Sequence, residues 1–135
     1  MFLFRAMFTC LDKMFSKMRV MRTELMFGRR VSLDKDCHIA AHTVLAAFHG
    51  AKLTVGVGCW FNKFCSVGAR EMIEIGDNCI FGENVKIYDH NHKHEIGNIP
   101  FKDQGFTTRP IKIGNNCWVG SNVVIVAGGG YWVIM

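Results

Sequence analysis

The sequence lacks the features that would send the chain to a membrane or out of the cell. No uncharged apolar stretch is long enough to cross a bilayer. No secretory signal is present, because Arg5 interrupts the apolar start and no apolar segment followed by a small-residue cleavage site appears. We therefore expect a cytoplasmic protein in a reducing compartment.

Acidic residues are fewer than basic ones, 11 against 16, and the imbalance is confined to one end of the chain. Residues 1–35 hold 8 basic and 3 acidic residues, which accounts for the whole formal charge of +5, while residues 36–135 hold 8 of each. The balanced body gives no reason to expect a nucleic-acid partner. A hydrophobic content of 50% excludes a disordered chain, and 135 residues suit a single domain.

Residues 2–27 have the apolar periodicity of a helix, with no Gly or Pro to interrupt it. The apolar residues recur at steps of three and four, at Leu3, Met7, Leu11, Met14, Met18, Met21 and Leu25. Basic residues such as Lys13 and Lys17 lie off this stripe, and Gly28 is a helix-stop residue. We expect an amphipathic helix that packs its stripe on the domain or on a neighbouring subunit. The alternative is a basic helix lying on an anionic membrane surface.

From residue 33 onward the sequence repeats every six residues. Each unit opens with an aliphatic or aromatic residue, and it has a turn residue at the fourth place and a small residue at the fifth. Three units make a row, and the four rows are residues 33–50, 55–72, 75–92 and 113–130. An insert of twenty residues, 93–112, separates the last two rows.

This repeat predicts a β-solenoid in which each unit is a short strand with a tight corner and three units close a triangular coil. The first-place residues would stack inward in two ladders, Leu33–Val55–Ile75–Ile113 and Leu45–Val67–Ile87–Ile125. The fourth place must turn the corner with a left-handed backbone, which Gly, Asn and Asp tolerate. In the first unit of each row this place holds Asp36, Gly58, Asn78 and Asn116.

Five of the six cysteines occupy the small fifth place: Cys37, Cys59, Cys65, Cys79 and Cys117. A free cysteine in such a corner behaves as a small hydrophobe. Neighbouring thiols would be one strand spacing apart, about 4.8 Å, but their side chains would point in parallel, which disfavours disulfides. Their spacing also suits stacking rather than a zinc tetrahedron, so we expect no resident metal.

The repeat and its insert resemble the hexapeptide-repeat acyltransferases over about residues 28–126. The segments IEIGDNCIFGENVKIYDHNHKHE and TTRPIKIGNNCWVGSNVVI carry the resemblance. They are most similar to O-acetyltransferases of sugar, capsule and O-antigen pathways, including maltose and galactoside O-acetyltransferases. The resemblance implies an all-β, left-handed parallel β-helix over residues 29–130. A helix over 1–28 precedes it, the insert 93–112 forms an extruded loop, and 131–135 lie outside the repeat.

The resemblance also implies an acetyl-CoA-dependent transfer of acetyl to a saccharide hydroxyl, in a homotrimer with active sites between subunits. Such a hydroxyl needs a base, and an imidazole of pKa near 6.5 can accept its proton. The family's catalytic histidine follows a strand tyrosine by four residues, so Tyr88 leads to His92. Since His90, His92 and His94 alternate, an extended stretch would place them on one side. A metal site with Asp89 or a plain solvated loop therefore stays open.

Other site residues carry over from the resemblance by position. Asp89 or a backbone carbonyl could orient the His92 ring. The expected acceptor-binding residues are Asn84, Tyr88, Asp89 and His90. The expected coenzyme A-binding residues are Arg109, Trp118 and Gly120.

Members of the family continue for two or more coils beyond the point where this repeat stops, at Val126 and Ala127. Those coils carry part of the coenzyme A groove. A truncated reading frame is one hypothesis for the ending GGGYWVIM, and it would give an inactive or coenzyme-deficient β-helix. A metal enzyme similar to the gamma-class carbonic anhydrases, using the loop histidines, is the other alternative.

Overall fold

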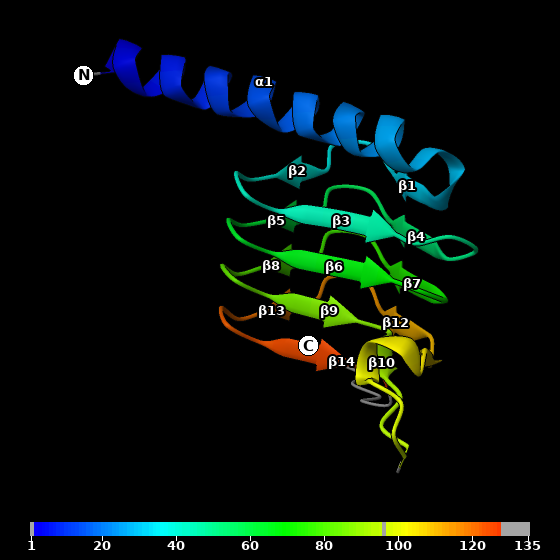
Figure 1. The fold of residues 1–135 in the computed structure, drawn as a ribbon. Helices are drawn as coiled ribbons and strands as arrows, with labels where there is room; N and C mark the ends of the chain where they lie inside the picture. The colour runs from blue at the N-terminus through cyan, green and yellow to red at the C-terminus, as the bar shows by residue number, and fades with distance from the viewer. Residues whose placement is uncertain (1, 96, 128–135) are drawn as a thin grey trace.

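The structure is a computed structural model that describes residues 2–95 and 97–127. A long helix, α1 (Phe2–Phe27), and a short 3-10 turn, η1 (Gly28–Arg30), precede a stack of short strands (Figure 1). The helix predicted at the start of the chain is therefore confirmed. The expected residues 131–135 outside the repeat fall beyond the described residues.

The strands form three four-stranded sheets in which every pairing is parallel. The first sheet contains β1 (Val31–Leu33), β4 (Lys52–Val55), β7 (Met72–Ile75) and β12 (Ile111–Ile113). The second contains β2 (His38–Ile39), β5 (Trp60–Phe61), β8 (Ile80–Phe81) and β13 (Trp118–Val119). The third contains β3 (Val44–Ala47), β6 (Ser66–Ala69), β9 (Lys86–Tyr88) and β14 (Val124–Val126). Successive strands belong to different sheets, which is the arrangement of a parallel β-helix.

The core consists of the ladders that the six-residue period predicts. The strand registers pair Leu33 with Val55, Val55 with Ile75, and Ile75 with Ile113, and all four side chains are buried. The registers also align the second predicted ladder, Leu45–Val67–Ile87–Ile125, which is buried as well. Each coil therefore removes apolar surface from water by stacking on the next, which is the main stabilising contribution in this architecture.

The corners have the backbone conformation that the fourth place predicts. The φ angles are 61° at Asp36, 55° at Asn78 and 57° at Asn116, and Gly58 has 68°. Stacked coils also come very close at the second place of a unit. A Cβ built on Gly76 would lie 2.8 Å from the backbone nitrogen of Asn115, so only glycine fits there.

The cysteines are free thiols, and four of them are buried in the corners: Cys59, Cys65, Cys79 and Cys117. The Sγ of Cys59 donates to the Gly76 carbonyl at 3.0 Å, and Cys79 donates to the Gly114 carbonyl at 3.0 Å. Burial raises the pKa of Cys79 to about 11. These thiols bridge neighbouring coils and are poor nucleophiles at neutral pH.

The helix α1 covers the first coil with a polar side. Ser16 is buried, and its Oγ accepts a hydrogen bond from the Ile39 N–H at 2.8 Å. The Arg19 guanidinium donates to the Ile39 carbonyl at 2.9 Å, so both polar groups of this edge residue are satisfied. The apolar stripe faces away, with Leu11, Met14, Met18, Met21 and Leu25 exposed. The expectation that this stripe packs on the domain is wrong for the described side chains.

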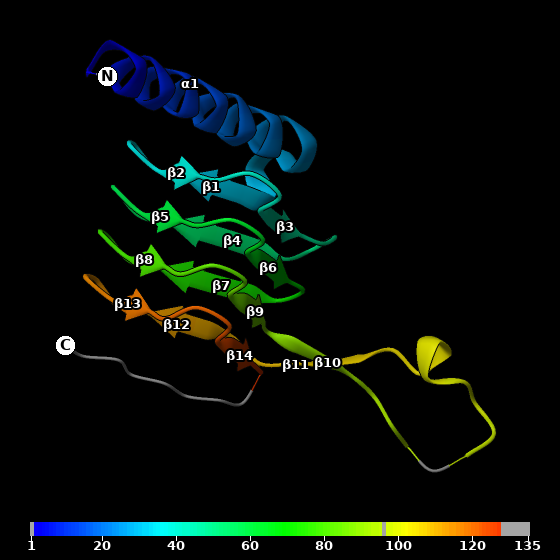
Figure 2. The same ribbon diagram turned by 90° about the vertical axis from the view of Figure 1, so that its left-hand side faces the viewer.

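The long insert leaves the coil as a hairpin. β10 (His90–His92) pairs antiparallel with β11 (Phe106–Thr108), and a 3-10 turn, η2 (Phe101–Asp103), lies in the loop between them. Figure 2 shows this hairpin projecting from the side of the stack. The chain bends out of the third sheet at Asp89, before the expected start of the insert at residue 93.

Candidate functional site

Asp89 anchors the bend where the hairpin leaves the coil. Its side chain is fully buried, and its carboxylate accepts hydrogen bonds from three consecutive backbone amides, those of Arg70, Glu71 and Met72, each at 2.8 Å. Arg70 and Glu71 form the turn between β6 and β7, and Met72 is the first residue of β7. The carboxylate therefore fixes the root of the hairpin to the coil before it.

His90 is the side chain that Asp89 orients. Its Nδ1 lies 3.1 Å from the Asp89 carboxylate, and its side chain is 15% exposed. The ring packs edge-on against Phe48, Tyr88 and Phe106, with centroid separations between 5.6 and 6.1 Å. A carboxylate at Nδ1 favours a proton on that nitrogen, which leaves Nε2 as the basic atom of the neutral ring.

His92, the predicted base, lies one strand step further out and is exposed. It pairs with Phe106 across the hairpin, and the two ring centroids are 4.3 Å apart. Among the described residues no hydrogen bond orients this ring, and the Asp89 carboxylate contacts His90 instead. His94 is exposed in the loop beyond β10. The three histidines thus differ in environment: a carboxylate contacts His90, His92 stacks on an aromatic ring, and His94 is exposed to solvent.

Sequence reasoning missed the residues that enclose these rings. The Arg70 guanidinium carbon lies 3.5 Å from the Phe106 ring centroid and 4.3 Å from that of Phe48, which is cation–π geometry. Phe48 and Arg70 belong to the third units of two different rows, and Phe106 belongs to the insert. No local pattern connects them, because the insert's return path brings Phe106 to the coil.

The expected acceptor-binding residues do not form one cluster in a single chain. Asn84 is a corner residue with φ 60°, and its Nδ2 donates to Oδ1 of Asn122 at 2.9 Å. The Tyr88 hydroxyl donates to the Ser66 Oγ at 2.9 Å and lies beside His90. Asn84 precedes β9, whereas the histidines follow it, so the two parts of the site lie beyond opposite ends of this strand.

The expected coenzyme-binding residues are also divided. Arg109 is exposed, its backbone N–H donates to the Asp89 carbonyl at 2.8 Å, and it borders a hollow of 330 Å³ beside the hairpin. Trp118 is 64% exposed on the outer face of β13, and Gly120 follows that strand. Figure 2 places β13 on the opposite side of the coil from β10. One chain therefore does not bring Trp118 to His92.

No group of three or more His, Cys, Asp and Glu side chains within residues 2–95 and 97–127 could hold a metal ion. The hairpin root places two imidazoles and an arginine cation around the Phe106 ring. An exposed imidazole can accept a proton from a hydroxyl, and a nearby cation favours developing negative charge.

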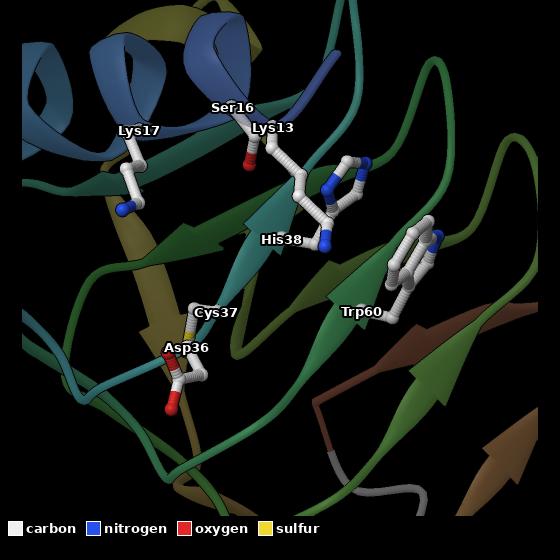
Figure 3. Close-up of a pocket in the computed structure, with 7 residues that line it drawn as sticks. All are labelled: Lys13, Ser16, Lys17, Asp36, Cys37, His38 and Trp60. Carbon is white, nitrogen blue, oxygen red and sulfur yellow. The ribbon is translucent and has the colours of Figure 1, made fainter. Parts of the chain in front are cut away.

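A second hollow, of 370 Å³, lies between α1 and the first coils (Figure 3). His38 stacks on Trp60 here, with ring centroids 3.7 Å apart, and its Nε2 lies 3.5 Å from the Asp12 carboxylate. Burial lowers the pKa of His38, Asp12 opposes this effect, and Arg19 adds to it. Lys13 and Lys17 border the hollow from the helix side.

Comparison with known proteins finds acetyltransferases among the sequence relatives of the chain. No family model matches the chain. It is 30% identical over 105 residues to a probable acetyltransferase of Mycobacterium tuberculosis, which is 78% of this chain and 33% of that protein. It is 32% identical over 82 residues to the galactoside O-acetyltransferase of Escherichia coli, which is 59% of this chain and 38% of that enzyme. The chain thus spans little more than a third of the length of the curated relatives it matches.

One solved structure supports the fold. It is the crystal structure of a hexapeptide-repeat-containing acetyltransferase from Vibrio cholerae, complexed with acetyl coenzyme A. The TM-score is 0.63, at 20% sequence identity, and the match covers 83% of this chain and 57% of that one. At this identity the likeness concerns the path of the backbone, which agrees with the parallel β-helix described above.

Proposed function

Because this chain belongs to the hexapeptide-repeat acyltransferase family, we propose that it acts in acetyl-CoA-dependent O-acetyl transfer to a hydroxyl of a saccharide or polysaccharide precursor. Two acetyltransferases are similar in sequence to parts of the chain, at 30% and 32% identity, and one of them acts on galactosides by name. The proposal includes left-handed coils, the hand implied by the family. It also includes a cytoplasmic location, a reducing compartment that suits free thiols.

The observation that carries the proposal is the construction of the hairpin root. A buried carboxylate, Asp89, is held by three amides and braces His90, while His92 projects from the same strand into solvent. A rigid root and an accessible imidazole are what a positioned general base requires. Asp89 by itself has a structural role, and the exposed His92 on this fixed root is what supports a catalytic function.

In the proposed reaction His92 is the general base. Its imidazole takes the proton of the acceptor hydroxyl while that oxygen attacks the thioester carbonyl of acetyl-CoA. The carbon–sulfur bond breaks when the tetrahedral intermediate collapses, coenzyme A leaves, and the imidazolium can return its proton to the thiolate. No acyl-enzyme is required, which agrees with the raised pKa of the buried Cys79 thiol.

We propose that the complete site forms between subunits of a homotrimer. Asn84, Tyr88, Asp89 and His90 serve the acceptor side, the last two by holding the hairpin root. Arg109, Trp118 and Gly120 serve the coenzyme side. Since Trp118 and His92 lie on opposite sides of one coil, a neighbouring subunit has to supply one of them. A closed three-fold ring is a common symmetry for this purpose.

An acceptor screen with acetyl-CoA tests the proposal. Free thiol release is followed with purified full-length chain across sugars, nucleotide sugars and a control without acceptor. We expect release that depends on one acceptor class, together with a calorimetric signal for coenzyme A binding. If coenzyme A does not bind and no acceptor is turned over, the chain is an inactive β-helix and the proposal is wrong.

A further inference from the structure

The outward face of α1 is apolar although the helix already has its place in the fold. Within the described side chains this face consists of Leu11, Met14, Phe15, Met18, Met21, Leu25 and Met26, which are between 37% and 84% exposed. The side of the helix that packs on the coil uses Ser16 and Arg19 for hydrogen bonds and Val20 and Phe27 for apolar contact. The helix is thus oriented with most of its apolar surface toward solvent.

This orientation contradicts what folding of the domain alone would favour. A surface helix normally turns its apolar stripe to the core and its charged side to water. Here the edge strand β2 requires a donor and an acceptor for Ile39, and Ser16 and Arg19 provide them. The outward stripe therefore contributes nothing to the described core. Contiguous exposed apolar surface of this kind marks an interaction site.

The charges around the stripe identify the partner. Arg22 and Arg29 are exposed, and Arg22 lies within the stripe, four residues after Met18, whereas Lys13 and Lys17 border the hollow on the side of the coil. The acidic residue Asp12 is turned to His38 at 3.5 Å, which leaves Glu24 as the acidic residue of the helix without a described contact to the coil. A second copy of this helix would bring like charges together, whereas an anionic lipid surface would neutralise them.

The shape of the molecule allows the whole stripe to touch a flat surface at once. Figures 1 and 2 show α1 as a straight rod across the outer end of the stack, with all strands on one side of it. Its 26 residues extend about 39 Å. No described helix is long and apolar enough to cross a membrane, so the geometry is that of a helix lying in the interface.

We infer that α1 binds anionic membrane surfaces through this stripe and holds the solenoid upright beneath it. The apolar side chains enter the boundary between headgroups and acyl chains. Arg22 reaches back to the phosphates along its aliphatic stem. This inference does not depend on the proposed reaction, because the hairpin projects from the far coils and shares no residue with α1.

Sedimentation with vesicles tests the inference on the full-length chain. Vesicles of phosphatidylcholine with phosphatidylglycerol are compared with phosphatidylcholine alone. We expect binding to the anionic vesicles that weakens with salt. The double variant M18E/L25E changes two exposed residues and should bind at least about tenfold more weakly, because two apolar side chains leave the lipid. R22Q should bind about fivefold more weakly at low salt, because one cation leaves the lipid surface.

The matched control is I99E/F101E, which introduces the same two charges at apolar residues that are 60% and 65% exposed in the hairpin loop. After allowance for its two added negative charges, it should bind vesicles within about twofold of the wild type. Circular dichroism checks that every variant folds. Equal vesicle binding by M18E/L25E and the wild type would overturn the inference. The inference would also be overturned if the wild type self-associates without lipid, M18E/L25E does not, and neither protein binds vesicles. The stripe would then bind a second copy of the chain.

Discussion

Asp89 concentrates more polar contacts than any other side chain named at the hairpin root. Three amides donate to its carboxylate, and His90 lies 3.1 Å away. Hydrogen bonds to a buried carboxylate are charge-assisted and are stronger than neutral ones. Their loss would leave three backbone amides, two in the β6–β7 turn and one at the start of β7, without these acceptors, which is costly in a buried position.

The substitution D89A should therefore lower the free energy of unfolding by about 3 kcal/mol or more. Urea unfolding followed by circular dichroism measures this value. The control E71Q changes an exposed carboxylate in the same turn and should stay within about 0.5 kcal/mol of the wild type. Equal stability of D89A and E71Q would show that the carboxylate does not hold the root.

The buried thiols make the fold sensitive to alkaline pH. Cys79 has an ordinary pKa of 9.0 that burial raises to about 11 in the folded protein. A group whose folded pKa is raised stabilises the fold fully below its unfolded pKa and loses that contribution as pH rises through the folded pKa. Between pH 9 and about 11 the wild type should lose about 2 to 3 kcal/mol through this residue. The stability of C79A should fall less steeply over the same range, and parallel curves would contradict this account.

These residue properties differ in how far the sequence predicts them. The corner residues and the thiols repeat every six residues, so their burial and backbone conformation follow from the unit itself. Arg70 and Phe106 carry no repeat signal. They meet each other only because the insert returns to the coil, and that path is a long-range property that local periodicity does not contain.

At the scale of elements, α1 is the clearest difference between expectation and structure. The periodicity correctly groups Met14, Met18 and Met21 on one face, but it does not state which way that face points. The edge of β2 decides the orientation, because the Ile39 N–H and carbonyl require Ser16 and Arg19. An unpaired strand edge is thus a stronger constraint here than the apolar moment of the helix.

The docking of α1 should weaken in mild acid through His38. Burial lowers its pKa below 6.5, so the stabilisation is present above pH 6.5 and is lost as pH falls through the folded pKa. The wild type should lose stability between pH 7 and about pH 5. The stability of H38Q should be lower at neutral pH but should change less across this range. Hydrogen exchange of α1 amides measures the effect. The control is H49Q, which changes an exposed histidine. If hydrogen exchange of α1 has the same pH dependence in H49Q as in H38Q, the prediction is wrong.

At the scale of the whole molecule, the stack separates two regions. The basic helix lies over the first coil, and the histidine hairpin leaves from the third row (Figure 1). The body between them has no net charge. This separation explains why the formal charge of +5 carries no information about the proposed reaction. The fold follows almost entirely from the repeat, whereas the proposed site combines residues of two subunits, which the period of one chain does not contain.

The central claim is that His92 is the base in acetyl transfer, and single-site kinetics test it most directly. H92A is compared with H49A, which removes an exposed histidine of the first row, outside the hairpin, and with H90A, which removes the ring beside Asp89. With the acceptor found in the screen, H92A should lower kcat by about 10²- to 10⁴-fold without changing coenzyme A binding. H49A should match the wild type. Turnover by H92A within about threefold of H49A would contradict the account, because the base would then be another group.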